Sequence, residues 1–175
     1  VMEKDDDFFD KCIEGFVMFN LNQGEVCTCP SRALIQESIY DKFMERAIAR
    51  TKAVVQDNPL KMETMIGAQA SVEQMEKIKS YLELGKKEGA KVLLGGKRPS
   101  GFNKGYFYEP TVFDDVKDDF TIMKQEPFGP LVPMLSFKTF DEVIERANNN
   151  DLGLCSYIYT NSMEQAHKAS ELMET

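Results

Sequence analysis

The sequence has no tryptophan, one histidine and four cysteines among its 175 residues. Four scattered cysteines are too few for the disulfide framework that is typical of small secreted proteins. A structural zinc site is not expected either, because His167 is the only histidine and no second cysteine pair accompanies Cys27 and Cys29. The sequence therefore predicts neither a disulfide-stabilised fold nor a metal site.

Long apolar runs and an excess of positive charge are also missing. No run approaches the roughly 18 apolar residues that a membrane span needs. Residues 1–7, Val-Met-Glu-Lys-Asp-Asp-Asp, do not resemble a signal peptide. The net charge of −8 opposes binding to nucleic acid or to an anionic membrane. We therefore expect a cytoplasmic protein with no nucleic acid or membrane partner.

Neither of the common phosphate-binding loops is present. No Gly-x-Gly-x-x-Gly follows a predicted strand, and Gly-x-x-x-x-Gly-Lys-Ser/Thr does not occur. Gly95 and Gly96 follow a predicted strand, but they enter a polar loop and lack a third glycine. They predict a turn and no nucleotide site.

What is present is the composition of an ordinary globular protein, with 42% hydrophobic and 29% charged residues. The length suits one domain with a sizeable core. Helical and strand-like patterns alternate along the chain, which predicts an α/β domain with a mainly parallel sheet and helices on its faces. Helices are predicted over residues 8–19, 38–57, 71–89, from 139 onward and from 162 onward, and strands or extended segments over 33–36, 91–94, 106–113, 131–137 and 154–159.

Local signals refine several of these elements. Asp5 to Asp7 are expected to cap the first helix. Capping-box spacing begins at Ser71, Thr139 and Ser162, and Gly89 is a natural end for the third helix. The prolines matter for the strands: Glu109-Pro110 makes an unbroken central strand improbable there, and Pro133 predicts an edge or irregular position for residues 131–137.

Cys27 is the first candidate for chemistry. It lies between a helical pattern and a short strand, in a break that begins with Gly24, so it is predicted to lie on a turn. A thiol on a turn is accessible to a substrate, and unpaired backbone N–H groups there can stabilise an oxyanion or a thiolate. The alternative is that Cys27 is a small buried hydrophobe, as many unpaired cysteines are.

Glu126 is the second candidate, because it precedes Pro-Phe-Gly-Pro at residues 127–130. Two prolines stiffen this loop and would hold Glu126 and Phe128 in fixed places. An ordinary exposed loop glutamate is the alternative. His167 lies in the last predicted helix and is expected to be a solvated residue, unless the fold brings it to Cys27 as a Cys–His dyad.

The segment Asn-Gln-Gly-Glu-Val-Cys at residues 22–27, followed by Arg32, resembles the active-site cysteine segment of the aldehyde dehydrogenase superfamily. Glu25 stands where many members have glutamine. Glu-Pro-Phe-Gly-Pro at residues 126–130 resembles the family's Glu-x-Phe-Gly-Pro motif, and residues 67–77 resemble a third family segment. The order and separation of the three agree with the family's catalytic domain.

This resemblance implies roles for four residues. Cys27 would attack the aldehyde carbon to give a thiohemiacetal, a hydride would pass to NAD or NADP, and water would hydrolyse the resulting thioester to the acid. Glu126 would hold the nicotinamide ribose, Phe128 would pack near the nicotinamide, and Gln74 would approach the same ribose. Cys29 would be a neighbour of the nucleophile.

The resemblance also implies that residues 1–175 are the catalytic, cysteine-bearing domain of a longer enzyme. The isolated fragment is then expected to be inactive, and the full-length parent to be a homo-oligomer. The dinucleotide-binding domain, with the general base and the oxyanion-hole asparagine, and the C-terminal oligomerisation segment have no counterpart here. Two other classes stay open: a non-catalytic interaction module with a structural Cys27, and a cysteine hydrolase that needs no cofactor.

Overall fold

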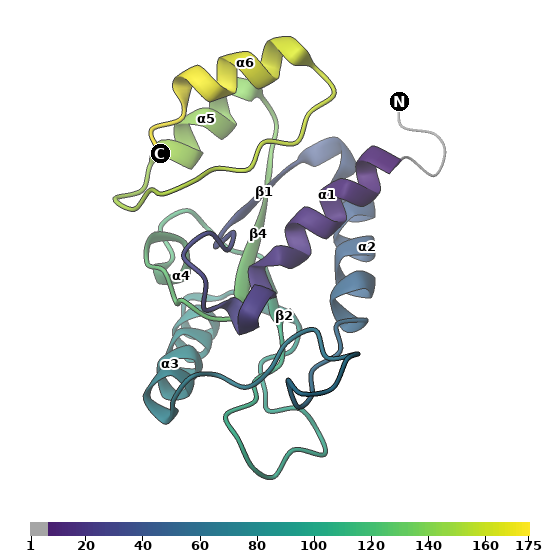
Figure 1. Cartoon of the computed structure of the whole chain (residues 1–175). Coiled ribbons are helices and arrows are strands. Elements are labelled where there is room, and N and C mark those ends of the chain that lie inside the picture. The colour runs from purple at the N-terminus through teal and green to yellow at the C-terminus, as the bar shows by residue number, and fades with distance from the viewer. Residues whose placement is uncertain (1–6) are drawn as a thin grey trace.

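The structure is a computed structural model that describes residues 7–175. The described residues form a sheet with the strand order β1-β4-β3-β2 (Figure 1). The strands are β1 (Ala33–Gln36), β4 (Leu131–Phe137), β3 (Thr111–Asp114) and β2 (Lys91–Leu94). Strand β4 is parallel to both β1 and β3, whereas β2 is antiparallel to β3. The predicted α/β fold with a mainly parallel sheet is confirmed.

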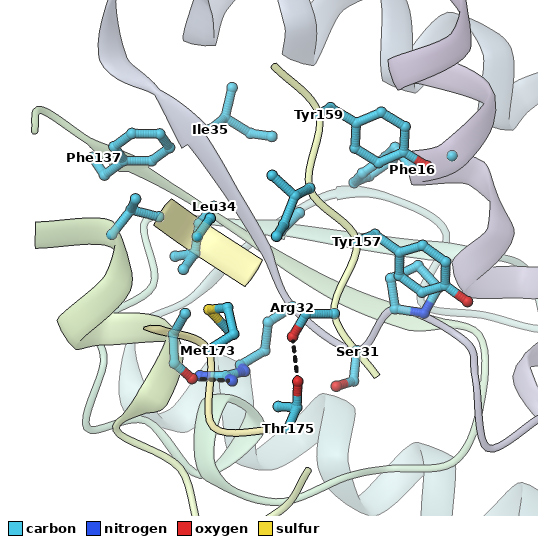
Figure 2. A pocket seen from close by; sticks show the side chains of 18 of the residues that line it. Phe16, Ser31, Arg32, Leu34, Ile35, Phe137, Tyr157, Tyr159, Met173 and Thr175 are labelled. Carbon is cyan, nitrogen blue, oxygen red and sulfur yellow. Dashed lines mark hydrogen bonds between the residues drawn. The ribbon is translucent and has the colours of Figure 1, made fainter. Parts of the chain in front are cut away.

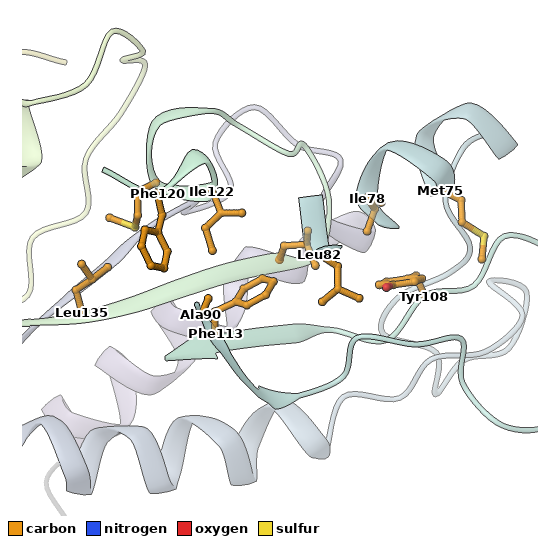
Figure 3. Packing of buried hydrophobic residues seen from close by; sticks show 11 residues of the cluster. Met75, Ile78, Leu82, Ala90, Tyr108, Phe113, Phe120, Ile122 and Leu135 are labelled. Carbon is orange, nitrogen blue, oxygen red and sulfur yellow. The ribbon is translucent and has the colours of Figure 1, made fainter. Parts of the chain in front are cut away.

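Helices cover both faces of this sheet, and the alternation of side chains along its central strands explains why. One core cluster joins α1 (Asp7–Val17) and α2 (Tyr40–Lys52) to β3 and β4 through Val112, Val132 and Met134. The other joins α3 (Val72–Glu88) and α4 (Thr121–Lys124) to the same strands through Phe113, Leu131 and Leu135 (Figure 3). Successive residues of a strand point to opposite faces, so an unbroken apolar run buries both.

The helix caps predicted at Ser71, Thr139 and Ser162 are present. The Oγ of Ser71 accepts a hydrogen bond from the Gln74 backbone N–H at 3.1 Å, and Gly89 ends α3 with a left-handed φ of 108°. Thr139 caps α5 (Phe140–Asn148), and Ser162 caps α6 (Met163–Leu172) in the same way. Each cap satisfies an N–H group that the first turn of a helix leaves without a partner.

The first two helices end earlier than their patterns predicted. Helix α1 ends at Val17 and continues as the 3₁₀ segment η1 (Met18–Gly24), and η2 (Glu37–Ile39) precedes α2, which ends at Lys52. Asp7 is the first residue of α1, and the other two predicted capping residues lie outside the described part of the chain. In the extended segment predicted over residues 106–113, strand β3 begins only at Thr111, directly after Pro110.

The edge position that Pro133 predicted for β4 is wrong, since β4 lies between β1 and β3. The register explains why a proline is tolerated there. Pro133 is the last β4 residue paired with β3, opposite Phe113, and pairing with β1 begins only at Met134. Proline has no backbone N–H, and Pro133 lies where β4 changes its partner from β3 to β1. The missing hydrogen bond therefore does not interrupt the middle of either strand pairing.

The strand predicted over residues 154–159 is also wrong. These residues run without helix or strand assignment, and Leu154, Tyr157 and Ile158 are 62%, 42% and 43% exposed. An alternating pattern makes a strand only where a neighbouring strand accepts its hydrogen bonds. Within residues 7–175 this segment has no strand paired with it.

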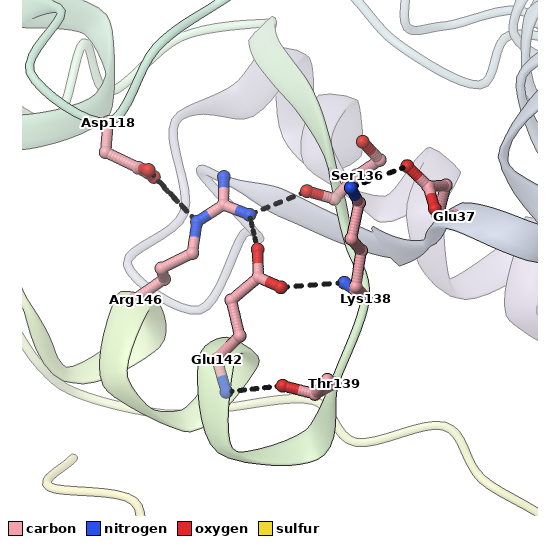
Figure 4. A network of polar contacts seen from close by, with 7 residues as sticks. All are labelled: Glu37, Asp118, Ser136, Lys138, Thr139, Glu142 and Arg146. Carbon is pink, nitrogen blue, oxygen red and sulfur yellow. Dashed lines mark hydrogen bonds and ion pairs between the residues drawn. The ribbon is translucent and has the colours of Figure 1, made fainter.

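Helices α5 and α6 lie together at one end of the molecule (Figure 1). Ala169 is their only buried residue among those described, so polar contacts matter for their attachment. Arg146 of α5 binds both carboxylate oxygens of Asp118 at 3.1 and 3.0 Å, the Ser136 carbonyl oxygen at 2.6 Å and Glu142 at 3.0 Å (Figure 4). From the start of β1, Arg32 donates to the carbonyl oxygens of Arg146 and Ala147.

No helix in the described part of the chain combines the length and the apolarity that crossing a membrane would require.

We expect Arg146→Ala to loosen α5 without unfolding the core. The side chain is only 17% exposed and its loss leaves Asp118 and Ser136 without these partners. Charged hydrogen bonds of this kind contribute about 1.5 kcal/mol or more, so α5 amides should exchange roughly tenfold faster with solvent. Lys79→Ala removes an exposed pair on α3 and serves as the control. Hydrogen exchange that accelerates equally in α3 and α5 would contradict a local role for Arg146.

Candidate functional site

The turn that carries Cys27 is built by three consecutive residues in left-handed conformations. Asn22, Gln23 and Gly24 have φ values of 46°, 51° and 78°. Side chains disfavour this region, at a cost of order 1 kcal/mol or more for each non-glycine residue, so surrounding contacts must hold it. The result is a sharp reversal of the chain between η1 and Cys27.

Cys27 itself lies at the first central position of a turn that the Cys29 N–H closes on the Val26 carbonyl oxygen at 2.9 Å. Its side chain is exposed. The prediction of a turn cysteine is therefore confirmed, and the alternative of a buried hydrophobe is wrong. An exposed thiol on a turn fixed by backbone hydrogen bonds is accessible to a small electrophile.

Cys29 differs from Cys27 although it lies two residues away. Its side chain is half-buried, and its Sγ donates to the Leu21 carbonyl oxygen at 3.5 Å. Burial raises the pKa of the Cys29 thiol, backbone hydrogen bonds from this turn lower it in part, and the nearby Glu126 and Cys27 raise it further. Cys29 therefore stays a protonated thiol that points back into the turn.

Residues 67–71 brace this turn from outside. The Glu25 carboxylate accepts hydrogen bonds from the Ala70 backbone N–H at 3.1 Å and from Gln23 Nε2 at 3.0 Å. The Gln69 side chain donates to the Gln23 carbonyl oxygen at 3.2 Å. The contacts from Ala70 and Gln69 cross 45 and 46 residues of sequence, and no local pattern would have found them.

The turn also touches the Glu126 loop, backbone against backbone. A Cβ atom at Gly24 would lie 2.2 Å from the Gly129 carbonyl carbon and 2.5 Å from the Pro130 nitrogen. No side chain fits at such distances, so glycine at position 24 is required by space as well as by its φ. The two motifs, separated by a hundred residues, share one contact surface.

The Glu126 loop, residues 124–130, is held at both ends. At its start, the Glu88 carboxylate accepts from the Thr121 backbone N–H and hydroxyl, which fixes the first turn of α4. At its end, Phe128 has a φ of 54°, and the Gln74 side-chain amide donates to its carbonyl oxygen. Gln74 therefore holds Phe128 in this unusual conformation.

Cys27 and Glu126 line the same cavity, which has a volume of about 910 Å³. It lies between β1, the Glu126 loop, and the segment from α5 to α6, and Arg32 and Tyr157 also line it (Figure 2). Glu126 is half-buried, and so is not the fully solvated loop residue of the alternative reading. The structure thus brings two of the four predicted site residues together.

The other two predicted residues, Gln74 and Phe128, contact each other but are not among the residues lining the cavity. His167 is exposed on α6 and does not line the cavity either. A Cys–His dyad is therefore not formed. Among residues 7–175, no group of three or more His, Cys, Asp and Glu side chains is placed to hold a metal ion.

A comparison with protein families matches residues 1–175 to the aldehyde dehydrogenase family. The chain is 50% identical, over 99% of its length, to a long-chain-aldehyde dehydrogenase of Acinetobacter sp, and 52% identical, over 96%, to acetaldehyde dehydrogenase 2 of Cupriavidus necator. It spans only about a third of these relatives, 34% of each.

Solved structures give the same result. The crystal structure of a betaine aldehyde dehydrogenase from Staphylococcus aureus, in complex with NAD+, superposes with a TM-score of 0.92 over 95% of this chain and 34% of that one, at 32% identity. An NAD+ complex of an aldehyde dehydrogenase from Bacillus cereus gives a TM-score of 0.91 at 36% identity, over 99% of this chain and 35% of the other. The chain shares the fold of these enzymes, its sequence matches the family over residues 1–175, and its two motifs are in contact. The chain therefore belongs to the aldehyde dehydrogenase family.

Proposed function

We propose that this chain is the cysteine-bearing catalytic domain of an NAD- or NADP-dependent aldehyde dehydrogenase that oxidises an aldehyde to a carboxylic acid. The observation that carries the proposal is the exposed Cys27 on a braced turn, in one cavity with the half-buried Glu126. Family membership supports it, as do relatives whose names give aldehydes as substrates.

Cys27 acts as the nucleophile in this proposal. Its sulfur bonds to the aldehyde carbon and gives a thiohemiacetal, which becomes a thioester on loss of a hydride and of the hydroxyl proton. Water then releases the acid and regenerates the thiol. NAD or NADP, when bound, supplies the hydride acceptor. The braced turn contributes by keeping the sulfur in one place while the acyl group stays attached, which favours reaction over diffusion.

The residues of the Glu126 loop suit the nicotinamide end of that cofactor. A half-buried carboxylate that faces a cavity is a strong acceptor for the hydroxyl groups of a ribose, and Glu126 is such a group. Phe128 offers an aromatic surface in the same loop. Gln74 was expected to approach the ribose, but its amide already donates to Phe128, so we assign it to positioning that loop.

The remainder of the longer protein completes the site in this proposal. The dinucleotide-binding domain, the general base, the oxyanion-hole asparagine and the segment that forms a homo-oligomer belong there. The partner is a small aldehyde, with no nucleic acid or membrane, and the location is cytoplasmic. The relatives are named for long-chain aldehydes, acetaldehyde and betaine aldehyde, so the proposal extends to the class of aldehydes only.

Two alternatives are less well supported. A cofactor-independent cysteine hydrolase needs a base beside the thiol, but His167 does not line the cavity with Cys27. An interaction module with a structural cysteine does not explain why Cys27 is exposed on a turn built from strained residues.

The thiols should differ in reactivity. Near neutral pH, limiting iodoacetamide is expected to label Cys27 before Cys29, because Cys29 is half-buried and its pKa is raised. Cys27 should also react before Cys12 and Cys155 if the braced turn activates it. Peptide mapping by mass spectrometry after short labelling gives the order. Preferential labelling of Cys29 would move the nucleophile by two residues.

The 175-residue chain alone should neither bind NAD with micromolar affinity nor oxidise aldehydes, since the proposal assigns the dinucleotide-binding domain and the general base to other residues. Calorimetric titration with NAD tests this, with the full-length enzyme as the positive control. Micromolar binding to the chain alone would place the cofactor site within these residues and refute the proposed domain boundary.

In the full-length enzyme, Glu126→Gln should slow hydride transfer while leaving Cys27 alkylation without cofactor nearly unchanged. A charged hydrogen bond replaced by a neutral one costs on the order of 1 kcal/mol, which corresponds to roughly a fivefold slower step, and a misplaced ring would add to it. Stopped-flow measurement of the NADH burst, with parallel thiol labelling, reports both quantities. Glu171→Gln, an exposed change on α6, is the matched control. An unaltered burst would remove Glu126 from the ribose site.

A further inference from the structure

All four cysteines of the chain line the cavity that contains Cys27. Cys27 and Cys29 come from the turn, Cys12 from α1, and Cys155 from residues 152–160, which we call the crossing segment. Cysteines distant in sequence and gathered around one cavity are candidates for thiol chemistry with one another. The proposed oxidation of aldehydes uses only one of them.

The crossing segment is held against the Cys27 turn by side chains. The Tyr157 hydroxyl donates to the Thr28 carbonyl oxygen, between Cys27 and Cys29, at 2.8 Å. Burial and the neighbouring Cys155 thiol raise the pKa of Tyr157, whereas the hydrogen bond to Thr28 lowers it in part. The Tyr157 phenol thus lies beside Cys155 and also contacts the centre of the turn. Figure 2 shows Tyr157 lining the cavity with Ser31 and Arg32, which follow the turn.

Further along, Tyr159 fixes the crossing segment to α1. Its hydroxyl oxygen would lie 1.9 Å from a Cβ atom at Gly15, so the ring packs directly on that glycine. The crossing segment, Cys155 included, has no strand paired with it in the described residues. The backbone around Cys155 can therefore shift without breaking a ladder of hydrogen bonds.

Cys27 and Cys155 are the exposed pair among the three thiols at the turn and crossing segment. Cys29 is half-buried, and its Sγ is directed to the Leu21 carbonyl oxygen, away from solvent. An oxidant reaches exposed thiols first, and a second exposed thiol nearby can then complete a disulfide.

We propose that Cys27 and Cys155 form a reversible disulfide when the protein meets hydrogen peroxide, with Cys155 as the resolving thiol. The Cys27 thiolate attacks one peroxide oxygen, the O–O bond breaks, and hydroxide leaves, so that Cys27 becomes a sulfenic acid. The Cys155 sulfur then attacks the Cys27 sulfur, an S–S bond forms, the S–O bond breaks, and water leaves. Two thiols are oxidised, one peroxide is reduced, and two waters are the products.

The disulfide would mask Cys27 and protect it from irreversible oxidation to the sulfinic acid, and a thiol reductant would restore it. The proposal depends on the positions of two sulfur atoms and not on aldehyde oxidation. It can therefore fail while the proposed function stands, and the reverse also holds.

The test uses the full 175-residue chain with Cys12→Ser and Cys29→Ser, which leaves only Cys27 and Cys155. After treatment with one equivalent of hydrogen peroxide at high dilution, tryptic peptides 12–32 and 147–168 should be joined in one species that dithiothreitol separates. Circular dichroism before treatment verifies folding. Peptides that remain separate, with Cys27 as sulfenic or sulfinic acid, would overturn the proposal, as would cross-linking only between two chains.

A matched variant tests the geometry. Adding Cys155→Ser and Ser156→Cys to that background moves the thiol by one residue. In the unaltered chain the Ser156 hydroxyl is hydrogen-bonded to the Thr175 hydroxyl at 2.9 Å. Neighbouring side chains of an extended segment point to opposite sides, so cross-linking should fall strongly. In the otherwise unaltered chain, Cys155→Ser should increase dimedone labelling of Cys27. Equal cross-linking in the shifted variant, or a Cys27–Cys29 disulfide formed at the original yield without Cys155, would show that Cys155 is not the resolving thiol.

Discussion

The site depends on the backbone contact between Gly24 and Gly129. The cysteine turn and the Glu126 loop are about a hundred residues apart in the sequence, and no side chain separates them at this point. Because neither backbone can retreat without losing its own bracing, the distance between Cys27 and Glu126 is set by rigid segments and not by side-chain rotamers. The strained conformations of Gln23 and Phe128 persist because Gln69, before α3, and Gln74, within α3, hold them.

Local features of the fold were predictable from the sequence. Ser71 and Gly89 mark the ends of α3 because a cap and a left-handed terminus need only nearby residues. The bounds of β1 and β2 follow from short apolar runs next to turn residues in the same way. Cys27 and Glu126 stood out as candidates because each interrupts a regular pattern. The family resemblance added their roles, which no pattern of hydrophobicity supplies.

Features that depend on distant partners were not predictable. Pro133 suggested an edge strand, but β4 changes partners at that residue, which is a property of register that only the assembled sheet defines. Residues 154–159 have the composition of a strand and no strand paired with them among residues 7–175. The Glu25 contact to Ala70 and the Tyr157 contact to Thr28 join segments that no spacing rule connects.

The different environments of Cys27 and Cys29 have one cause in the backbone. The left-handed residues 22–24 fold the chain back so that the Leu21 carbonyl oxygen lies within reach of Cys29 Sγ. The following turn, closed on Val26, then leaves Cys27 at its exposed corner. The geometry that buries one thiol and raises its pKa therefore presents the other to the cavity. A single strained turn thus leaves one thiol exposed at the cavity and the other half-buried against the backbone, although the two lie only two residues apart.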